Sequence, residues 1–422
     1  MIKILDYSAL GQTIFNRTEQ KFDVEKIVAD IIENVKTNGD DALKYYTEKF
    51  DKAKLDDLLV SQKEFDDAFE EIDDEFIEIL KKASENIFAF HKNQVRQGFE
   101  IKRDDGVIIG QKITPVQRAG LYVPGGTATY PSTVLMDAIP AKIAGVEEIA
   151  IVTPPDKTGK VNPAILVASK IAGVDKVYKV GGAQAIAALA YGTQTINKVD
   201  KIVGPGNAFV AEAKRQVFGK VSIDMIAGPS EILVIADANS NPRHVAADLL
   251  SQAEHDKMAS AVLVTDSYDL AKAVQEQIEI LLKDLPRAEI ARASIEDNGK
   301  IIVAKNFDEV LAVSNEIAPE HLELMVDDPF AYLDKIKNAG SIFMGRYCPE
   351  SLGDYYAGPN HTLPTSGTAR FSSPLSVDDF IKKSQYTYYT KDALEKVYKD
   401  VDYFAKKEGL TAHGKSATVR FE

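Results

Sequence analysis

The stretch KIAGVEEIAIV at residues 142–152 recurs in altered form as KIAGVDKVYKV at residues 170–180. In both copies the end of a predicted helix is followed by a glycine, Gly145 or Gly173, and then by a run typical of a β-strand. Glycine suits the left-handed conformation that closes many helices. The repeat therefore predicts that one βα unit is used twice.

The surroundings of the repeat extend the same pattern. From about residue 105 to 235, Ala-rich helical segments alternate with short β-rich runs, namely GVIIGQKI, EEIAIVT, KVYKV, KIVG and EILVIAD. This alternation is typical of βαβ units. A second α/β stretch covers about 235 to 345, where Pro242 suits the first turn of a helix that leads to the strand SAVLVTD.

The two ends of the chain differ from this α/β region. Residues 20 to 100 predict helices, because two apolar stripes recur at helical spacing on either side of Asn38-Gly39-Asp40. The first stripe contains Val24, Ile27, Val28, Ile31, Ile32 and Val35, and the second contains Phe65, Phe69, Ile72, Phe76 and Ile79. Residues 346–375 are rich in Pro, Gly, Ser and Thr, which predicts a long functional loop. Residues 376–422 predict one or two short helices.

Composition narrows the class of protein. The 422 residues include 64 acidic and 50 basic side chains, a formal net charge of −14, which disfavours a nucleic-acid surface but is compatible with a local pocket for phosphate. Cys348 is the one cysteine, so an internal disulfide and a cysteine-based zinc site are excluded. The first residues do not resemble a signal peptide, and no uncharged apolar run reaches the roughly 18 residues of a membrane span. We expect a soluble, cytoplasmic protein.

Candidate metal ligands are scattered along the chain. Gln252 and His255 are three residues apart within the helix predicted from Pro242, so they share one face. Asp354 lies in the long loop and His413 near the C-terminus. Two imidazoles, a carboxylate and an amide oxygen would leave metal positions open for a substrate. A polar helix face, an Asx turn and an exposed terminal histidine explain the same residues separately, and spacing alone does not bring them together.

Glu320 and His321 form an acid–base candidate immediately after Pro319. In a loop both side chains can face one cavity, where a histidine can take a proton from an alcohol and a carboxylate can activate water. The alternative is a surface pair at the edge of a sheet.

Three glycine-rich segments occupy residues 121–136, 180–192 and 203–217. The last two place glycines between a predicted strand and an Ala-rich helix, which suits close approach of a phosphate to a helix N-terminus. None is a G-x-G-x-x-G motif, and a tight turn explains any one of them. Three such segments within one βα-rich region favour a bound nucleotide.

Taken together, these motifs resemble the histidinol dehydrogenase family along the chain from about residue 20 to the tail. The motifs are AGLYVPGG, VGGAQAIAAL, VGPGN, DMIAGPSEILVIAD, SQAEHD, APEHLEL, the SLGDY to TARF segment and EGLTAHG. The resemblance implies two Rossmann-like, aldehyde-dehydrogenase-like α/β domains with a helical N-terminal segment and an extended C-terminal tail. The implied boundaries are an N-terminal arm at 1–19, a first domain at 20–121 plus 232–375 with most of the zinc and catalytic site, an NAD-binding domain at 122–231, and a tail at 376–422.

The resemblance also implies an activity, the zinc-dependent, NAD-linked oxidation of L-histidinol to L-histidine through L-histidinaldehyde. His321 would be the general base and Glu320 would activate water. Zinc, one ion per subunit, would be held by Gln252, His255, Asp354 and His413. NAD would contact Tyr122, Gln184 and Asn207, while Ser230, Glu408, His321 and the zinc ligands would surround the substrate.

The family is further implied to be a homodimer in which the tail of one subunit reaches the site of the other. Glu408 and His413 would then act in the partner's site. Cys348 is the only possible thiol nucleophile, and we expect it to be dispensable. A zinc-dependent hydrolase and a non-catalytic NAD-binding protein are the alternatives, which titration with NAD and replacement of His321 distinguish.

Overall fold

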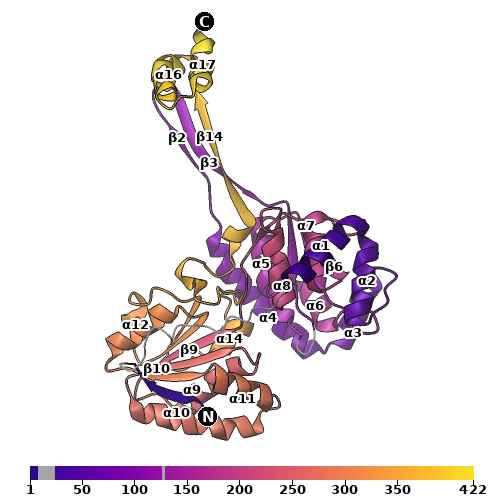
Figure 1. Ribbon diagram of the computed structural model, residues 1–422, viewed down its shortest axis with the longest axis vertical. Coiled ribbons are helices and arrows are strands. Elements are labelled where there is room, and N and C mark those ends of the chain that lie inside the picture. The colour runs from indigo at the N-terminus through magenta and orange to yellow at the C-terminus, as the bar shows by residue number, and fades with distance from the viewer. Residues whose placement is uncertain (8–23, 126–128) are drawn as a thin grey trace. The chain divides into compact units, whose positions relative to one another are not determined.

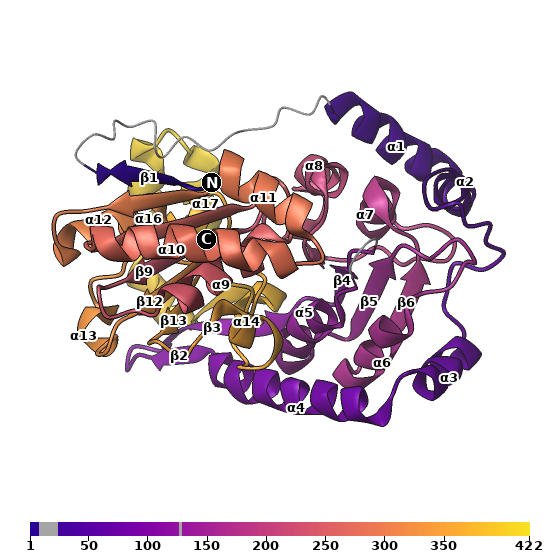
Figure 2. The ribbon, with the colours of Figure 1, turned by 90° about the horizontal axis from the view of Figure 1, so that it is seen from below.

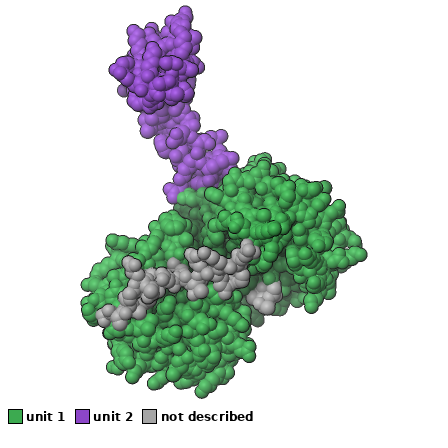
Figure 3. Space-filling view, in the orientation of Figure 1, with its two compact units in different colours: residues 1–94, 117–380 green, residues 95–116, 381–422 purple. Residues whose placement is uncertain are grey.

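The computed structural model describes residues 1–7, 24–125 and 129–422. Residues 8–19 of the predicted N-terminal arm and residues 126–128 of the first glycine-rich segment lie outside the described residues. The chain divides into two compact units, coloured separately in Figure 3. Unit 1 contains Met1–Gln94 and Gln117–Phe380, and unit 2 contains Val95–Val116 and Ile381–Glu422.

One half of unit 1 is built on a six-stranded sheet in which every pair is parallel. Its order is β1 (Lys3–Asp6), β11 (Lys300–Val303), β10 (Ser260–Thr265), β9 (Glu231–Ala236), β12 (His321–Met325) and β13 (Ser341–Met344). One face packs on α9 (Pro242–Ala253), α10 (Tyr268–Leu281) and α11 (Ala288–Asp297), and the other on α12 (Phe307–Ile317) and α13 (Phe330–Leu333) (Figure 1). Helices on both faces explain why β9 and β12 are buried along their whole length.

The other half of unit 1 contains a five-stranded parallel sheet. Its order is β6 (Lys176–Lys179), β5 (Glu148–Thr153), β4 (Arg118–Tyr122), β7 (Lys201–Val203) and β8 (Ser222–Ile223). The chain crosses from β4 to β6 in one direction and then returns to add β7 and β8 on the other side of β4. The strand order therefore reverses between β4 and β7, which is where open α/β sheets bind ligands.

The helices of the five-stranded sheet confirm the repeat. They are α5 (Pro131–Ala144), α6 (Pro163–Ala172), α7 (Gly182–Tyr191) and α8 (Ala208–Val217), and Figure 2 shows α6 and α7 on opposite sides of β5 and β6. Gly145 closes α5 with φ 87° and Gly173 closes α6 with φ 74°, both left-handed. A strand of the same sheet follows each glycine, as the two copies of the repeat predicted.

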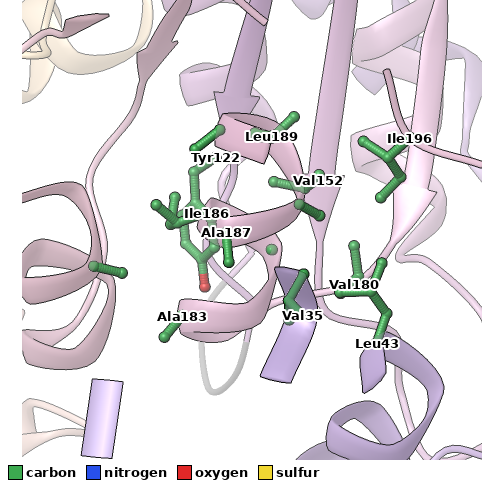
Figure 4. Close-up of a cluster of buried hydrophobic side chains, with 14 of the residues drawn as sticks. Val35, Leu43, Tyr122, Val152, Val180, Ala183, Ile186, Ala187, Leu189 and Ile196 are labelled. Atoms are coloured by element: carbon green, nitrogen blue, oxygen red, sulfur yellow. The ribbon is translucent and has the colours of Figure 1, made fainter. Parts of the chain in front are cut away.

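The N-terminal helices pack against this five-stranded half. They are α1 (Glu25–Asn38), α2 (Asp40–Asp51), α3 (Gln62–Glu71) and α4 (Asp74–His91), and their helical neighbours are α5 to α8. In Figure 4, Val35 of α1 and Leu43 of α2 lie near Val180 in the buried cluster around α7. The domain boundaries inferred from the sequence, which join these helices to the six-stranded half, stay a prediction.

The two predicted apolar stripes differ in outcome. On α1 the stripe is confirmed except at its start, because Val28, Ile31, Ile32 and Val35 are buried whereas Ile27 is exposed. The second stripe is wrong, since Phe69 and Ile79 are exposed and the face of α4 that is buried consists of Ile77, Leu80, Ala83, Ile87 and His91. The chain breaks between α3 and α4 at Ile72 and Asp73, and Asp73 caps a new helix, so the helical phase changes there.

Unit 2 is a three-stranded antiparallel sheet followed by short helices. The strand order is β14 (Ile381–Tyr389), β3 (Val107–Pro115) and β2 (Phe99–Lys102), and the helices are α15 (Lys391–Glu395), α16 (Tyr398–Lys407) and α17 (Thr411–Thr418). The run GVIIGQKI is a strand, as predicted. Its expected place in a βαβ unit is wrong, because it forms the central strand of this antiparallel sheet. The one or two short helices predicted after residue 376 are present as α15, α16 and α17, but the prediction missed β14, which pairs with β3 along nine residues.

The predicted α/β class with two parallel sheets and a helical N-terminal segment is confirmed. In the described part of the chain, no helix combines the length and the apolar character that crossing a membrane requires. The remaining elements are one short helix, α14 (Glu350–Tyr355), and the 3-10 helices η3 (Lys92–Gln94), η4 (Leu282–Asp284), η5 (Thr368–Arg370), η6 (Val377–Phe380) and η7 (Val419–Phe421).

Candidate active site

Glu320 and His321 are positioned by the end of α12 and the start of β12. Ala318 takes a left-handed conformation with φ 50° and closes α12, so that Pro319 turns the chain into the sheet. His321 is the first residue of β12, which lies between β9 and β13. Glu320 is 7% exposed and His321 4% exposed, so the alternative of a surface pair at a sheet edge is wrong.

One residue of the neighbouring strand holds both side chains. The backbone N–H of Glu231 donates to Oε2 of Glu320 at 2.8 Å, and Nδ1 of His321 lies 2.9 Å from the backbone oxygen of Glu231. Because a carbonyl only accepts, Nδ1 carries the proton and the lone pair is on Nε2. Nε2 of His321 is buried and has no hydrogen-bond partner among the described residues. A base is thus left free to act.

Glu350 and Asp354 face that free nitrogen. Oε1 of Glu350 and Oδ1 of Asp354 each lie 3.8 Å from Nε2 of His321. Both carboxyls come from α14, where a spacing of four residues puts them on one face. The prediction that Asp354 lies in an irregular loop is therefore wrong. We call Glu320, His321, Glu350 and Asp354 the acid–base cluster.

The carboxyls of the acid–base cluster are buried close together, and this shifts their pKa values. Burial, with repulsion from neighbouring carboxylates, raises the pKa of Glu320 well above its usual value and that of Glu350 to about 7. Burial also raises the pKa of Asp354 to about 6 and lowers the pKa of His321. Among the described residues, the neighbouring charges that contribute most to these shifts belong to carboxylates and histidines.

A divalent cation fits this arrangement. One ligand atom from each of His321, Glu350 and Asp354 can be chosen so that all lie within 4.8 Å of one another, although only Asp354 of these three is among the zinc ligands predicted from the sequence. Oε1 of Glu350 and Oε1 of Gln252 are both buried without a hydrogen-bond partner in the described part of the chain. Nitrogen and oxygen donors of this kind suit zinc, and its charge would relieve the repulsion between the carboxyls.

Gln252 and His255 lie at the end of α9, but in different conformations. The helix ends at Ala253, so the prediction of a helical His255 is wrong; a turn follows in which the backbone N–H of His255 donates to the backbone oxygen of Gln252 at 3.2 Å. Gln252 is buried, while His255 is half-buried. The charge of His255 acts on the pKa values of His321, Glu350 and His361, so His255 faces the acid–base cluster.

Two further residues at the cluster had no role assigned from the sequence, Glu350 and His361. Nδ1 of His361 lies 3.1 Å from the backbone oxygen of Asp354 and Nε2 lies 3.2 Å from Oγ1 of Thr133 on α5. Burial lowers the pKa of His361 to about 4. The four-residue spacing of Glu350 and Asp354 could have indicated one helical face, whereas the contact with Thr133 has no local signal.

The remaining predicted substrate and zinc residues are Ser230, which belongs to unit 1, and Glu408 and His413, which belong to unit 2. Ser230 is half-buried directly before β9, and its backbone oxygen accepts from the Ser260 N–H at 3.0 Å. Glu408 ends α16 and His413 lies on α17, both exposed and both in unit 2. The contacts of the acid–base cluster given above all come from unit 1, and roles for Glu408 and His413 stay predictions.

Tyr122 and Gln184, two predicted NAD contacts, meet at the start of α7. The Tyr122 hydroxyl accepts from the Gly182 N–H at 3.0 Å, and Figure 4 shows the ring extending toward this end of α7. Gly182 has φ 67°, and a Cβ there would lie 2.7 Å from Oε1 of Gln184, an atom that is buried without a hydrogen-bond partner. An unpartnered amide oxygen at a helix start after a β-strand is available to a ligand.

Asn207, the third predicted contact, begins α8 by accepting from the N–H groups of Phe209 at 3.0 Å and Val210 at 3.2 Å. The turn that leads to it starts at Gly204, where a Cβ would lie 2.2 Å from the backbone oxygen of Tyr122. The ends of β4 and β7 thus touch at the point where the strand order reverses. A nucleotide is expected at this point of such a sheet.

Comparison with known proteins agrees with this geometry. The family model described as histidinol dehydrogenase matches residues 15–421. The chain is 54% identical over 424 residues to histidinol dehydrogenase of Clostridium acetobutylicum, covering 99% of this chain and 98% of the relative. The match to the Streptococcus mutans enzyme is 56% over 411 residues, covering 97% and 96%.

A solved structure also matches along the whole length. The crystal structure of histidinol dehydrogenase from Elizabethkingia anophelis superposes with a TM-score of 0.95 at 42% identity, covering 100% of this chain and 98% of that chain. Both the sequence and the fold match from end to end, so the chain belongs to the histidinol dehydrogenase family.

Proposed function

We propose that the protein oxidises L-histidinol to L-histidine through L-histidinaldehyde, reducing two molecules of NAD, as the last step of histidine biosynthesis. Its relatives carry the name of this activity. The observation in the chain itself that supports the proposal most is the free Nε2 of buried His321, set opposite Glu350 and Asp354. An alcohol oxidation needs a base at such a point to take the hydroxyl proton.

His321 is the base in both oxidation steps. Burial lowers its pKa, so the ring is neutral near physiological pH and its lone pair is available. The hydrogen bond from Nδ1 to the Glu231 backbone keeps Nε2 directed at the substrate. Nε2 takes the hydroxyl proton of the alcohol and later that of the hydrated aldehyde.

Glu320 serves the water-adding step. Its Oε2 is held by the Glu231 N–H, which leaves Oε1 to take a proton from a water that attacks the aldehyde. Burial raises the pKa of Glu320, so the carboxyl must first lose its own proton, and the carboxylate is then a stronger base toward that water. The same strand residue orients both catalytic groups, so their spacing is set by the register of β9 and β12.

Zinc would be held by Gln252, His255 and Asp354 together with His413 of the partner subunit. When bound, zinc would supply a Lewis acid that anchors the substrate. The buried, unpartnered Oε1 of Gln252 and the uncompensated carboxyls support this assignment. Ser230 and Glu408 of the partner subunit line the substrate.

NAD is bound at Tyr122, Gln184 and Asn207, at the carboxyl ends of the strands of the five-stranded sheet. When bound, NAD supplies the hydride acceptor. Gln184 offers an amide oxygen that has no partner among the described residues, and the turn from Gly204 to Asn207 brings the chain to the start of α8 beside β4.

The active molecule is a homodimer in which unit 2 of one subunit completes the site of the other. The exposure of Glu408 and His413 supports this, because both side chains are accessible to a partner and the acid–base cluster does not belong to their unit. A chain truncated after residue 405 and a His321→Ala chain should each be inactive, and mixing them under dimer exchange should restore part of the activity. Absence of any restored activity would place the tail in its own subunit's site.

The experiment that tests the proposed function counts the products. Zinc-loaded protein, limiting L-histidinol and excess NAD should yield two molecules of NADH and one of L-histidine per L-histidinol. A zinc hydrolase would turn over its substrate without NAD, and a non-catalytic NAD-binding protein would form no NADH. Either of these two results contradicts the proposal.

A further inference from the structure

A second buried polar cluster lies at the carboxyl end of the five-stranded sheet and takes no part in the chemistry above. It consists of Lys214 on α8, Asp224 directly after β8 and Asp137 on α5, which we call the Lys214 cluster. The Lys214 and Asp224 side chains form an ion pair at 2% and 1% exposure, and Asp137 is fully buried.

The ion pair holds a single residue, Gly204, at both of its polar backbone groups. The Gly204 N–H donates to Oδ2 of Asp224 at 2.8 Å, and Nζ of Lys214 donates to the Gly204 oxygen at 2.9 Å. Gly204 has φ 110°, which favours glycine, and a Cβ would lie 2.2 Å from the Tyr122 oxygen. The start of the turn to Asn207 is therefore fixed against β4 by charged partners.

Asp137 joins this turn to the loop beside the acid–base cluster. A Cβ on Gly204 would lie 3.1 Å from Oδ2 of Asp137, while Oδ1 accepts from Oγ1 of Thr362 at 2.9 Å. Thr133, one helical turn earlier on α5, contacts the neighbouring His361. One face of α5 thus packs against the Gly204 turn at Asp137 and is bonded to the loop of His361 and Thr362.

The charges of the Lys214 cluster balance within it. Burial, with the charge of Asp224 adding, raises the pKa of Asp137 to about 8, so near neutral pH its carboxyl is largely protonated and one lysine faces one carboxylate. Such a cluster has no surplus charge with which to bind an ion. A buried ion pair contributes little net stability compared with apolar packing. The geometric effect of this pair is instead to fix the backbone of Gly204.

We propose that Lys214, Asp224 and Asp137 are positioning residues of the dehydrogenase, which fix the Gly204–Asn207 turn for the nucleotide and connect it to the loop of His361. The inference rests on the proposed NAD site and adds residues that act on it through Gly204 and Thr362. None of the three touches the reacting atoms.

The test removes the ion pair as a unit, so that no charge is left buried alone. In Lys214→Met/Asp224→Asn, the loss of charged hydrogen bonds to Gly204 should weaken NADH binding about tenfold or more and raise KM for NAD similarly. The value of kcat at saturating NAD and the affinity for L-histidinol should change by less than about threefold, since those groups stay in place. Unchanged NADH affinity in a folded double variant overturns the proposal.

Asn207→Ala, measured in parallel, separates the two levels of inference. If Asn207→Ala weakens NADH binding and the double variant does not, the positioning role is wrong and the NAD site stands. If neither variant weakens it, the NAD site itself is wrong, and the positioning role with it.

A milder pair of variants decides the matter if the double variant does not fold. Thr362→Val keeps the shape but removes the hydroxyl that donates to Asp137, whereas Thr362→Ser keeps the hydroxyl. We expect KM for NAD to rise about threefold to tenfold in Thr362→Val and to stay unchanged in Thr362→Ser. A change of this size corresponds to the free energy of about one hydrogen bond. Equal KM values for the two variants overturn the link between the Gly204 turn and the His361 loop.

Discussion

The acid–base cluster and the Lys214 cluster are both buried sets of ionisable groups at strand ends, but their charges are arranged in opposite ways. The acid–base cluster lies at the amino ends of β9 and β12 and combines three carboxyls with a histidine, and in the described part of the chain its strongest charged neighbours are further carboxylates and histidines. The Lys214 cluster lies at the carboxyl end of β7 and contains its own cation.

This difference distinguishes a site from a scaffold. Nε2 of His321 and Oε1 of Glu350 are buried without hydrogen-bond partners, which is costly unless a ligand or ion completes them. Lys214 and Asp224 instead direct their bonds at the backbone of Gly204. On our proposals, the unbalanced cluster is the one where chemistry occurs, and the balanced cluster holds a turn in place.

Replacing His321 should have the largest effect on the acid–base cluster. His321→Asn removes the lone pair at Nε2, so kcat should fall by roughly a hundredfold to ten-thousandfold, the usual contribution of a general base. The rate of NADH formation from L-histidinol measures this effect, with melting temperature and NADH affinity as controls for folding. A loss below about tenfold would assign the base to another group.

Replacing Glu320 should affect mainly the second oxidation. Glu320→Gln keeps the shape and the bond from the Glu231 N–H but cannot take a proton from water. With L-histidinaldehyde supplied directly, the rate should fall about a hundredfold, whereas the oxidation of the alcohol should fall less.

Cys348→Ala is the matched control for that experiment, because it removes the only thiol of the chain. We expect both half-reactions to remain within about twofold of the unaltered protein, the ordinary scatter of a surface substitution. Loss of the aldehyde step in Cys348→Ala, combined with its retention in Glu320→Gln, would reverse the assigned roles.

Removing the metal should abolish turnover, and added zinc should restore it.

Glu350→Gln reduces the negative charge beside Asp354, so zinc affinity should fall about tenfold, the usual effect of altering a group next to a metal ligand. Competition with a coloured chelator measures this affinity, and Glu85→Gln, at an exposed position on α4, is the control. Equal zinc affinity in both variants would exclude Glu350 from the surroundings of the ion.

The smallest effect should be a change in the pH dependence of stability at Asp137. Burial raises its pKa to about 8 in the folded protein, from an ordinary value of 3.8, so the folded state keeps a proton that the unfolded chain has lost. Its contribution to stability therefore decreases as the pH rises through this interval.

Asp137→Asn removes that dependence, because an amide does not titrate. The free energy of unfolding of the variant, relative to the unaltered protein, should rise by about 1 to 3 kcal/mol from pH 5 to pH 8. Denaturant titration at several pH values measures the slope, and any constant offset from the altered bond to Thr362 does not affect it. A flat difference would mean that Asp137 is already ionised near neutral pH.

Local pattern was a reliable guide where the signal is contained in a few neighbouring residues. The repeat placed Gly145 and Gly173 at helix ends, and the spacing of Val28, Ile31 and Val35 predicted the buried face of α1. The pattern failed at α3 and α4, where one cap at Asp73 shifts the phase. It also failed at β3 and β14, because each strand's partner lies in a distant part of the chain.

The sequence by itself determined the α/β class, the family and the identity of the residues that can carry acid–base chemistry. Side-chain chemistry and helical or strand periodicity are local, so they can be read without coordinates. Only the tertiary structure decided that Glu231 orients both Glu320 and His321, that Glu350 lies beside them, and that Lys214 and Asp224 hold Gly204. Those contacts depend on strand register and on helix packing, which join residues far apart in the chain.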